Sequence, residues 1–323
     1  MPSNLNVLFY ILVTDLLLIL FGYLIIRKRL AWIGWLLFVL TILLIGQVCV
    51  NENPVFRMLA IISSMFICMK IIAACESYKR HIFNLSFLQW IAFAIGWAGM
   101  RAQLFESLRG KQLPGAASMF WYGISRLCMG IIILLLAKQI LLLDINKEVI
   151  FFAVTGLLLI GYSLILHFGI LSMSAGVWRW LAVKTYLLFR SPLLSTSLSE
   201  FWSKRWNIAF SEMISIAIYR PLKKRVGPAG LIIISFIFSG LLHEMAISLP
   251  VGMGFGLPFV YFIIQGTMVL LEKILEDRNI IFLKNKFIAK VWVYFWVIIP
   301  APLLFHIYFI KGIVWPVMGL KMP

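Results

Sequence analysis

The sequence has few charged residues, and this shortage excludes a soluble globular protein. Only 13% of its 323 residues are charged, whereas soluble domains carry about a quarter. Hydrophobic residues make up 63% of the chain, and runs of about 20 apolar residues, the length that crosses a bilayer as a helix, recur along it. The composition therefore predicts an integral membrane protein with several spans.

Cysteine is also scarce, and common cofactor motifs are missing. The four cysteines form no CxxC pair, and the chain has no zinc-ligand spacing, Walker loop, GxGxxG or GxSxG. These absences argue against a disulfide scaffold, a zinc site and a nucleotide-binding loop. We expect no metal and no bound cofactor, and we expect free, buried thiols at Cys49, Cys68, Cys75 and Cys128.

Acidic residues are outnumbered, with 12 Asp and Glu against 29 Lys and Arg, for a formal net charge of +17. In a soluble protein this excess would suggest nucleic acid. Here the basic residues lie in short gaps between apolar runs, where Lys and Arg set the topology and contact anionic lipids. We therefore expect membrane lipids and no nucleic acid as partners, and the oligomeric state stays open.

The apolar runs predict an all-α polytopic bundle that forms one domain over residues 1–323. Shorter apolar pieces at 87–99 and 208–219 cannot cross alone and suit re-entrant or interfacial helices. The predicted spans are 7–26, 31–50, 58–75, 127–143, 149–171, 229–249, 254–272 and 291–311.

The gaps between these spans differ in charge and predict the orientation. Lys and Arg gather in alternate gaps, whereas the other gaps and the C-terminal tail hold only Arg57, Lys147, Lys311 and Lys321. Because basic residues concentrate on the cytoplasmic side, this pattern places both termini outside. The short chain and compact loops favour a bacterial inner membrane.

His243 is the strongest candidate for chemistry. It lies in Ser239-Gly240-Leu241-Leu242-His243-Glu244, about 20 Å along its span by helical rise. An ionisable residue at this depth marks a functional site or forms a hydrogen bond between helices. Its unperturbed pKa, about 6.5, suits a general acid or base. Glu244 follows it, and either assists the site or sits at a helix break.

A second cluster is Phe201-Trp202-Ser203-Lys204-Arg205-Trp206-Asn207. Trp with Lys and Arg is typical of the membrane interface, which is the plainer interpretation of Trp202 and Lys204. Asn207 opens an apolar stretch, where its amide either caps a helix or orients a reacting carbonyl.

The third cluster is a basic turn between Arg220 and Pro228. Proline ends the helices on either side of it, and its charges set topology or receive the phosphates of a cosubstrate. Its basic residues are Arg220, Lys223, Lys224 and Arg225.

These blocks, in this order and spacing, resemble the wax synthase branch of the membrane-bound O-acyltransferase superfamily. The blocks are Ser197–Asn207, Tyr219–Leu222 and Ser239–Glu244, so the resemblance covers about residues 190–250. Trp97-Ala98-Gly99-Met100-Arg101 also looks like a family feature. Ser203-Lys204-Arg205 stands where many relatives have Gly-Arg-Arg.

The resemblance implies transfer of an acyl group from acyl-CoA, as cosubstrate, to a hydroxyl. The acceptor would be a long-chain alcohol, giving a wax ester, or another lipid or isoprenoid alcohol. It also implies that His243 is the catalytic base and that Asn207 assists it. We expect substrate contacts from Trp202, Arg205, Trp206, Arg220, Lys223, Lys224, Arg225 and Glu244.

Two other functions fit the residues. In a transporter or channel, Asp15, His243 and Glu244 would form an intramembrane proton relay. Paired broken helices or inverted repeats, which are common in transporters, are not evident in the sequence. A non-catalytic membrane scaffold with the same fold is the third reading.

Overall fold

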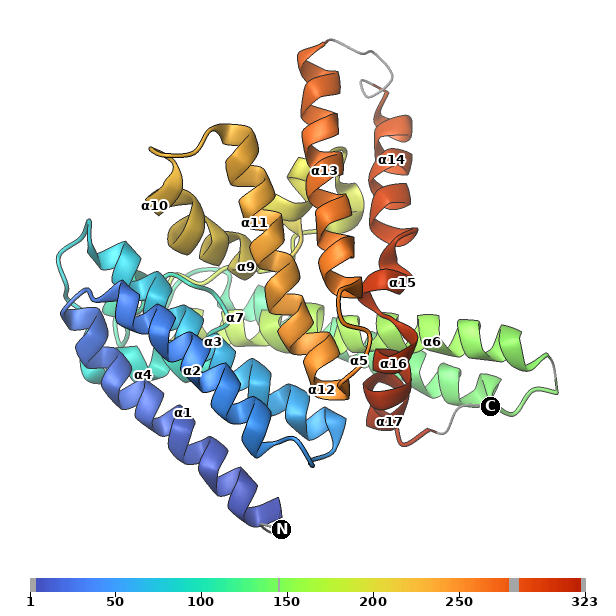
Figure 1. Cartoon of the computed structure of the whole chain (residues 1–323), viewed down its shortest axis with the longest axis horizontal. Coiled ribbons are helices and arrows are strands. Elements are labelled where there is room, and N and C mark those ends of the chain that lie inside the picture. The colour runs from blue at the N-terminus through green and yellow to red at the C-terminus, as the bar shows by residue number, and fades with distance from the viewer. Residues whose placement is uncertain (1–3, 145, 279–284, 321–323) are drawn as a thin grey trace. The chain divides into compact units, whose positions relative to one another are not determined.

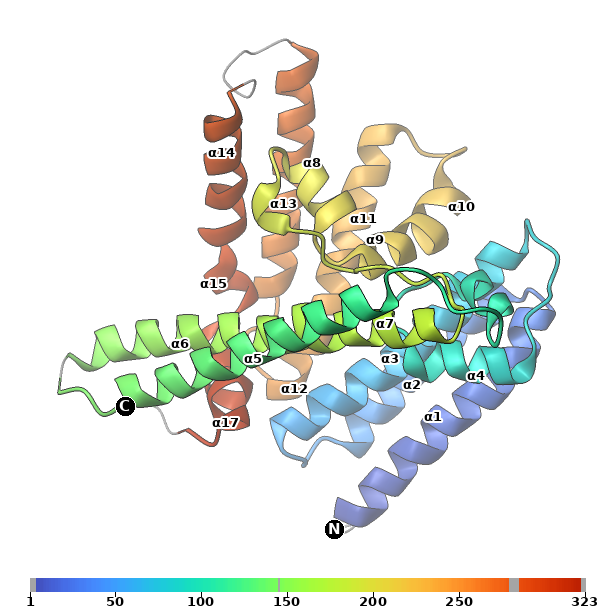
Figure 2. The same ribbon diagram turned by 180° about the vertical axis from the view of Figure 1, so that it is seen from behind.

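The computed structural model describes residues 4–144, 146–278 and 285–320, and this part of the chain contains helices but no strand (Figures 1 and 2). The predicted eight-span helical bundle is confirmed, and the protein is a multi-pass integral membrane protein. Lys284 and Lys321, which entered the charge pattern, lie outside the described residues. The helices long and apolar enough to cross a bilayer run over Leu5–Arg27, Ala31–Val48, Pro54–Tyr78, Ala116–Ile140, Lys147–Trp180, Pro228–Val251, Leu257–Asp277 and Lys286–Leu304.

The ends of two spans differ from the prediction for local reasons. Helix α5 (Ala116–Ile140) begins well before residue 127, directly after Gly115, whose φ of 79° favours glycine. The last span stops at Leu304 rather than 311, after the short α15 (Ala301–Leu304) with proline in its first turn. The apolar piece at 87–99 forms α4 (Phe87–Gly96), which is ten residues long and too short to cross, as predicted.

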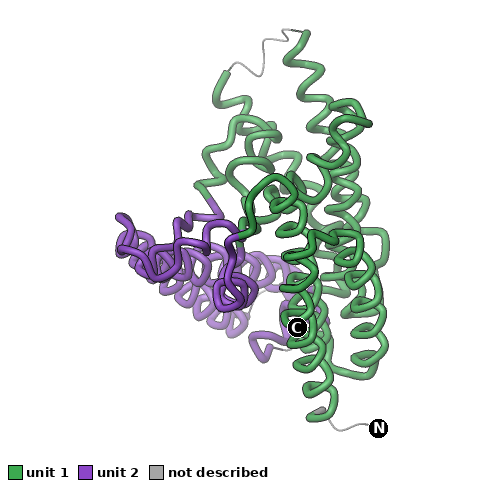
Figure 3. The backbone as a smooth tube through the Cα atoms, turned by 90° about the vertical axis from the view of Figure 1, so that its left-hand side faces the viewer, with its two compact units in different colours: residues 1–83, 99–101, 190–309 green, residues 84–98, 102–189, 310–323 purple. Residues whose placement is uncertain are grey.

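The chain forms two compact units (Figure 3). The first comprises residues 1–83, 99–101 and 190–309, and begins with α1 (Asn4–Arg27), α2 (Ala31–Val48) and α3 (Pro54–Tyr78). Helix α3 is the most enclosed of the spanning helices. It packs against both α1 and α2 and also against the segments that surround residues 208–251. It is therefore the core of this unit.

The rest of the first unit carries three further spans. Helix α11 (Pro228–His243) continues through η6 (Glu244–Ser248) and α12 (Leu249–Val251), and packs along α13 (Leu257–Asp277). Glycine allows the close approach of α11 and α13. A Cβ at Gly240 would lie 2.9 Å from Phe259 Cδ2, and one at Gly266 would lie 2.8 Å from Phe236 Cβ. Helix α14 (Lys286–Ile298) follows α13.

The second unit comprises residues 84–98, 102–189 and 310–323. Its long helix α5 packs along a continuous helix made of α6 (Lys147–Ser163), η2 (Leu164–Ile170) and α7 (Leu171–Trp180). Small residues again line the contact, as in many membrane bundles. Its remaining elements are α4, η1 (Ala102–Ser107), η8 (Ile310–Val314) and α17 (Trp315–Val317).

Single π-helical turns interrupt the helices of the first unit near the residues that the sequence singled out. They are η4 (Phe201–Arg205), η5 (Ser215–Tyr219) and η6. Helix α8 (Leu198–Glu200) directly precedes η4, α9 (Ile208–Ile214) lies between η4 and η5, and α10 (Arg220–Leu222) directly follows η5. Such turns are rare in ordinary helices and frequent at functional sites.

The cysteine prediction is right in part. All four thiols are free, and Cys49, Cys68 and Cys75 are buried. Cys128 is exposed, so the prediction of burial is wrong there. The reason is its position on α5, a helix that buries only a narrow face of mostly small residues.

Candidate active site

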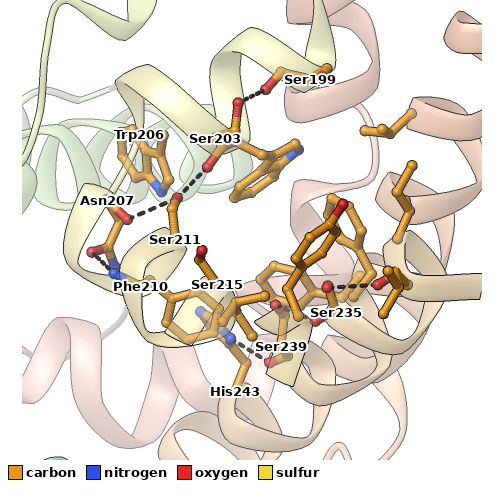
Figure 4. Close-up of a pocket in the computed structure, with 18 residues that line it drawn as sticks. Ser199, Ser203, Trp206, Asn207, Phe210, Ser211, Ser215, Ser235, Ser239 and His243 are labelled. Atoms are coloured by element: carbon orange, nitrogen blue, oxygen red, sulfur yellow. Dashed lines mark hydrogen bonds between the residues drawn. The ribbon is translucent and has the colours of Figure 1, made fainter. Parts of the chain in front are cut away.

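A cavity of about 340 Å³ lies within the first unit (Figure 4). It is enclosed by η4, α9, η5, α11 and α13, and its volume is in the range of small-molecule sites. Its lining brings together His243, Asn207, Trp202 and Trp206, four of the ten residues that the sequence assigned to the site. The remaining residues of the cavity lining are Ser199, Ser203, Phe210, Ser211, Ile214, Ser215, Tyr219, Leu231, Ile232, Ser235, Phe236, Ser239, Phe262 and Val269.

His243 is the last residue of α11, just before the π turn η6. Its Nδ1 lies 2.7 Å from the backbone carbonyl oxygen of Ser239, one helical turn earlier. Because a carbonyl oxygen only accepts, Nδ1 carries the proton, and Nε2 keeps its lone pair. The imidazole packs between Phe262 and Phe210, with ring centroids 4.2 and 5.6 Å away. This hydrogen bond holds the neutral ring in the one tautomer that leaves Nε2 as the basic nitrogen.

Asn207 has a positive φ of 43° and is the residue before α9. Asn tolerates this left-handed backbone better than most residues. Its Oδ1 accepts a hydrogen bond of 3.2 Å from the Phe210 amide, so the capping role considered from the sequence is present. Since the oxygen is used on the helix, the NH2 end of the same amide is the group available as a donor to a ligand in the cavity.

Trp202, on η4, and Trp206, directly after η4, both line the cavity. Trp202 Nε1 donates to Gln265 Oε1 at 3.1 Å, and Gln265 Nε2 donates to the Trp296 carbonyl oxygen at 2.6 Å. Trp206 stacks on Phe201 with centroids 5.6 Å apart. The two indoles are therefore fixed parts of the wall.

Glu272 orients this wall, although the sequence reading overlooked it. Its two carboxylate oxygens accept hydrogen bonds from the amides of Leu198 at 2.9 Å and Ser199 at 3.1 Å. The side chain is buried on α13, opposite the beginning of α8 and η4. An acidic residue within an apolar span was the sequence signal that could have revealed this role. The first amides of α8 are suitable donors to it, because amides at the start of a helix have no partner within the helix.

The segment at Gly99–Arg101, noted as a family feature, belongs to the first unit and contacts α9. Arg101 Nε lies 2.6 Å from Glu212 Oε1, and the Met100 amide donates to the other oxygen at 3.4 Å. Glu212 is buried. This pairing stabilises the helix that begins at Asn207.

Arg205 does not line the cavity. Its Nε lies 2.7 Å from Glu200 Oε1, and its guanidinium also approaches the carbonyl oxygens of Arg190 and Ser191 at 3.4 Å. Hydrogen bonding from the Thr196 amide and the pairing with Arg205 hold the pKa of Glu200 below its ordinary value. Arg205 therefore tethers the segment before η4.

The basic turn is exposed and lies outside the cavity lining. Arg220, Lys223, Lys224 and Arg225 are all solvent-accessible. Tyr219, the residue directly before them, lines the cavity and is 42% exposed. The turn thus adjoins one edge of the cavity, and its role as a phosphate site stays a prediction.

Glu244 points to another part of the first unit. Its Oε1 accepts a hydrogen bond of 3.0 Å from the Phe259 amide near the start of α13, and the residue is absent from the cavity lining. Of the two roles considered for it, Glu244 therefore fits the one at a helix break, because it accepts a hydrogen bond from an amide at the beginning of the next helix.

The side chains around the cavity do not suggest a metal centre. Within residues 4–144, 146–278 and 285–320, no three His, Cys, Asp or Glu residues cluster as ligands. The other buried histidine of the first unit, His306, bonds Ser248 at 3.3 Å and lies outside the lining. The groups at hand are an imidazole, an amide, indoles and hydroxyls, which suit proton transfer and hydrogen bonding.

Comparison with known proteins gives matches over the segment that builds this cavity. Residues 185–264 match the model of the membrane bound O-acyl transferase family. The chain is 34% identical over 73 residues to a long-chain-alcohol O-fatty-acyltransferase of Simmondsia chinensis, covering 20% of this chain and 21% of the relative.

Two Arabidopsis thaliana proteins match over stretches of similar length. Probable long-chain-alcohol O-fatty-acyltransferase 2 is 37% identical over 67 residues, and acyl-CoA–sterol O-acyltransferase 1 is 34% identical over 64 residues. Each match covers 18% of this chain and 19% of the relative, so the chain spans about a fifth of the length of these curated relatives. The resemblance predicted from the three sequence blocks is confirmed over residues 185–264, where the chain matches the model of the membrane bound O-acyl transferase family.

Proposed function

We propose that the protein is an acyl-CoA-dependent O-acyltransferase that esterifies a lipid alcohol. The observation that carries the proposal is the cavity shared by His243 and Asn207, in which one imidazole nitrogen is tied to Ser239 and the other is free to accept a proton. The matched relatives, named for long-chain alcohols and a sterol, support this substrate class.

In the proposed reaction, His243 Nε2 takes the proton of the acceptor hydroxyl as its oxygen attacks the thioester carbon. Such general-base assistance is worth about 10²- to 10⁴-fold in rate. The NH2 group of Asn207 donates to the oxygen that gains negative charge. The proton then passes from His243 to the departing thiolate, and no acyl-enzyme forms.

The cavity and its surroundings also suggest where the two substrates bind. Apolar side chains at Phe210, Ile214 and Phe262 suit an acyl chain, whose burial is worth about 0.8 kcal/mol per methylene. The CoA phosphates would lie at the exposed basic turn next to Tyr219, on the side that the charge pattern places inward. The proposal includes both termini outside and a bacterial inner membrane.

The transporter reading has less support. Asp15 accepts a short hydrogen bond of 2.5 Å from Ser64, and Glu244 bonds the Phe259 amide. Neither acid lines the cavity that contains His243. A proton relay through Asp15, His243 and Glu244 would need the two acids to contact the cavity that contains His243.

The test is mass spectrometry of lipids from cells that express the protein or an empty vector. The wild-type protein should add a new ester, and His243→Ala should lower its amount at least 10²-fold at equal expression, because the base is lost. His81→Ala, at an exposed histidine outside the cavity, is the matched control. An unchanged ester level in His243→Ala would remove this residue from the mechanism.

A further inference from the structure

Serine is unusually frequent in the cavity wall. Six of the 18 lining residues are serines, and they come from η4, α9, η5 and α11 and the short helix before them (Figure 4). They are Ser199, Ser203, Ser211, Ser215, Ser235 and Ser239. A pocket for a hydrocarbon alcohol with one hydroxyl needs polar groups only around that hydroxyl. The serines therefore supply more hydrogen-bonding groups than the reaction alone requires.

Four of these hydroxyls use their protons on the backbone. Ser203 donates to the Ser199 carbonyl oxygen at 2.5 Å and Ser211 to that of Trp202 at 2.6 Å. On α11, Ser235 donates to Leu231 at 2.7 Å and Ser239 to Ser235 at 2.9 Å. A hydroxyl has one proton and two lone pairs, so each oxygen is left as an acceptor.

The acceptors on α11 form a row that ends at the base. Ser235, Ser239 and His243 are spaced by four residues, so their side chains share one helix face. Successive members rise about 6 Å along the axis. His243 Nε2 is also an acceptor, because Nδ1 carries the proton. A ligand along this row must therefore supply hydrogen-bond donors at more than one point.

We propose that the preferred acceptor carries at least two hydroxyl groups a few carbons apart, as in a lipid diol, a glycerol derivative or a glycoside. This inference rests on the proposed function. One hydroxyl donates to His243 Nε2 and reacts, while a second donates to Ser239 or Ser235 Oγ. The reacting oxygen bonds to the acyl carbon and the carbon–sulfur bond breaks. The proton passes through His243 to the thiolate, and the second hydroxyl stays unchanged.

The test compares two acceptors of equal chain length, hexadecan-1-ol and hexadecane-1,4-diol, with palmitoyl-CoA as donor. The wild-type protein should show a kcat/KM for the diol higher by roughly three- to tenfold, the value of one neutral hydrogen bond. At least one of Ser235→Ala and Ser239→Ala should lower this diol-to-monool ratio, and Ser235→Thr should preserve it by keeping a hydroxyl.

Ser125→Ala is the control, because Ser125 also donates to a carbonyl of its own helix, at 2.7 Å, but lies outside the cavity. It should leave the ratio unchanged. Equal kcat/KM for the two alcohols in the wild type would overturn the inference, as would a diol-to-monool ratio that stays unchanged in both Ser235→Ala and Ser239→Ala. Acylation of neither alcohol, or of any other, would instead refute the proposed function on which it rests.

Discussion

At the level of single residues, the Asn207 amide has an oxygen that is engaged on the helix and a nitrogen that the proposed reaction assigns to the substrate. Its oxygen caps α9 through the Phe210 amide, and its nitrogen is left for the cavity. The sequence reading gave both uses as alternatives, since a residue at the start of an apolar stretch commonly caps a helix. The structure makes the two uses compatible, which the sequence had no means to show.

Asn207→Asp separates these two uses. The aspartate keeps an oxygen for the Phe210 amide, so thermal stability should stay near that of the wild type. It loses the donating NH2, so kcat should fall about 10²- to 10³-fold, as for the loss of one oxyanion donor. Paired measurements of melting temperature and kcat check this.

Asn207→Gly is the companion variant, because glycine accepts the positive φ without adding a charge. It should lose activity similarly, at a small cost in stability. Retention of full activity in both variants would rule out a role for the amide in the reaction.

Glu200 predicts a pH dependence. Its folded pKa lies below the ordinary value of 4.5, because the Thr196 amide and Arg205 favour the carboxylate. The resulting stability is present above about pH 4.5 and is lost as the pH falls through the folded pKa. In detergent, wild type should therefore melt above Glu200→Gln at neutral pH, and the gap should close in acid. A constant gap across the range would contradict this.

At the level of helices and turns, the first unit depends on close approaches and π turns that hydrophobic patterns do not reveal. Eight apolar runs predicted eight spans, because length and hydropathy are local properties. The π turns η4, η5 and η6 leave the apolar pattern of the sequence unchanged. The role of Glu272 was missed for the same reason, since its partners at residues 198 and 199 are distant in sequence.

Gly240→Ala should weaken the packing of α11 on α13. The added Cβ would lie 2.9 Å from Phe259 Cδ2 and 3.1 Å from Phe259 Cα, and the backbone atom cannot rotate away. Overpacking of this kind costs about 1–3 kcal/mol. The melting temperature should fall, and activity should fall with it because His243 ends the same helix.

Gly46→Ala is the matched control, because a Cβ there meets nothing within 4 Å. Its stability should be equal to or slightly above that of the wild type, since alanine favours helix over glycine. A melting temperature for Gly240→Ala no lower than that of the control would show that the contact is not tight.

At the level of the whole molecule, fold class and site were predictable to different extents. The three sequence blocks indicated the cavity segment, and His243, Asn207, Trp202 and Trp206 meet there. Arg205 pairs with Glu200 outside the cavity lining, an ion pair that the sequence analysis did not consider, and its predicted contact with substrate stays a prediction. The serines were overlooked because a single serine in an apolar helix is common and gains meaning only from its neighbours.

The charge pattern predicts the orientation of the chain, which cysteine labelling tests. In intact cells with Cys128 replaced by alanine, a membrane-impermeant maleimide should label Asp144→Cys in an outer gap and spare Lys111→Cys in an inner one, both at exposed positions. Permeabilised cells should label both. The reverse pattern in intact cells would place both termini inside.

The hydrogen bond from His243 Nδ1 to its own helix has a kinetic consequence. Because Nδ1 is engaged with the Ser239 carbonyl oxygen, only Nε2 can exchange a proton with the substrates. The ring therefore cannot accept a proton at one nitrogen and release it from the other. In the proposed reaction, the proton taken from the alcohol must leave by the same atom, to the thiolate that the attack of the alcohol releases. Both substrates would then occupy the protein together, and turnover would follow ternary-complex rather than ping-pong kinetics.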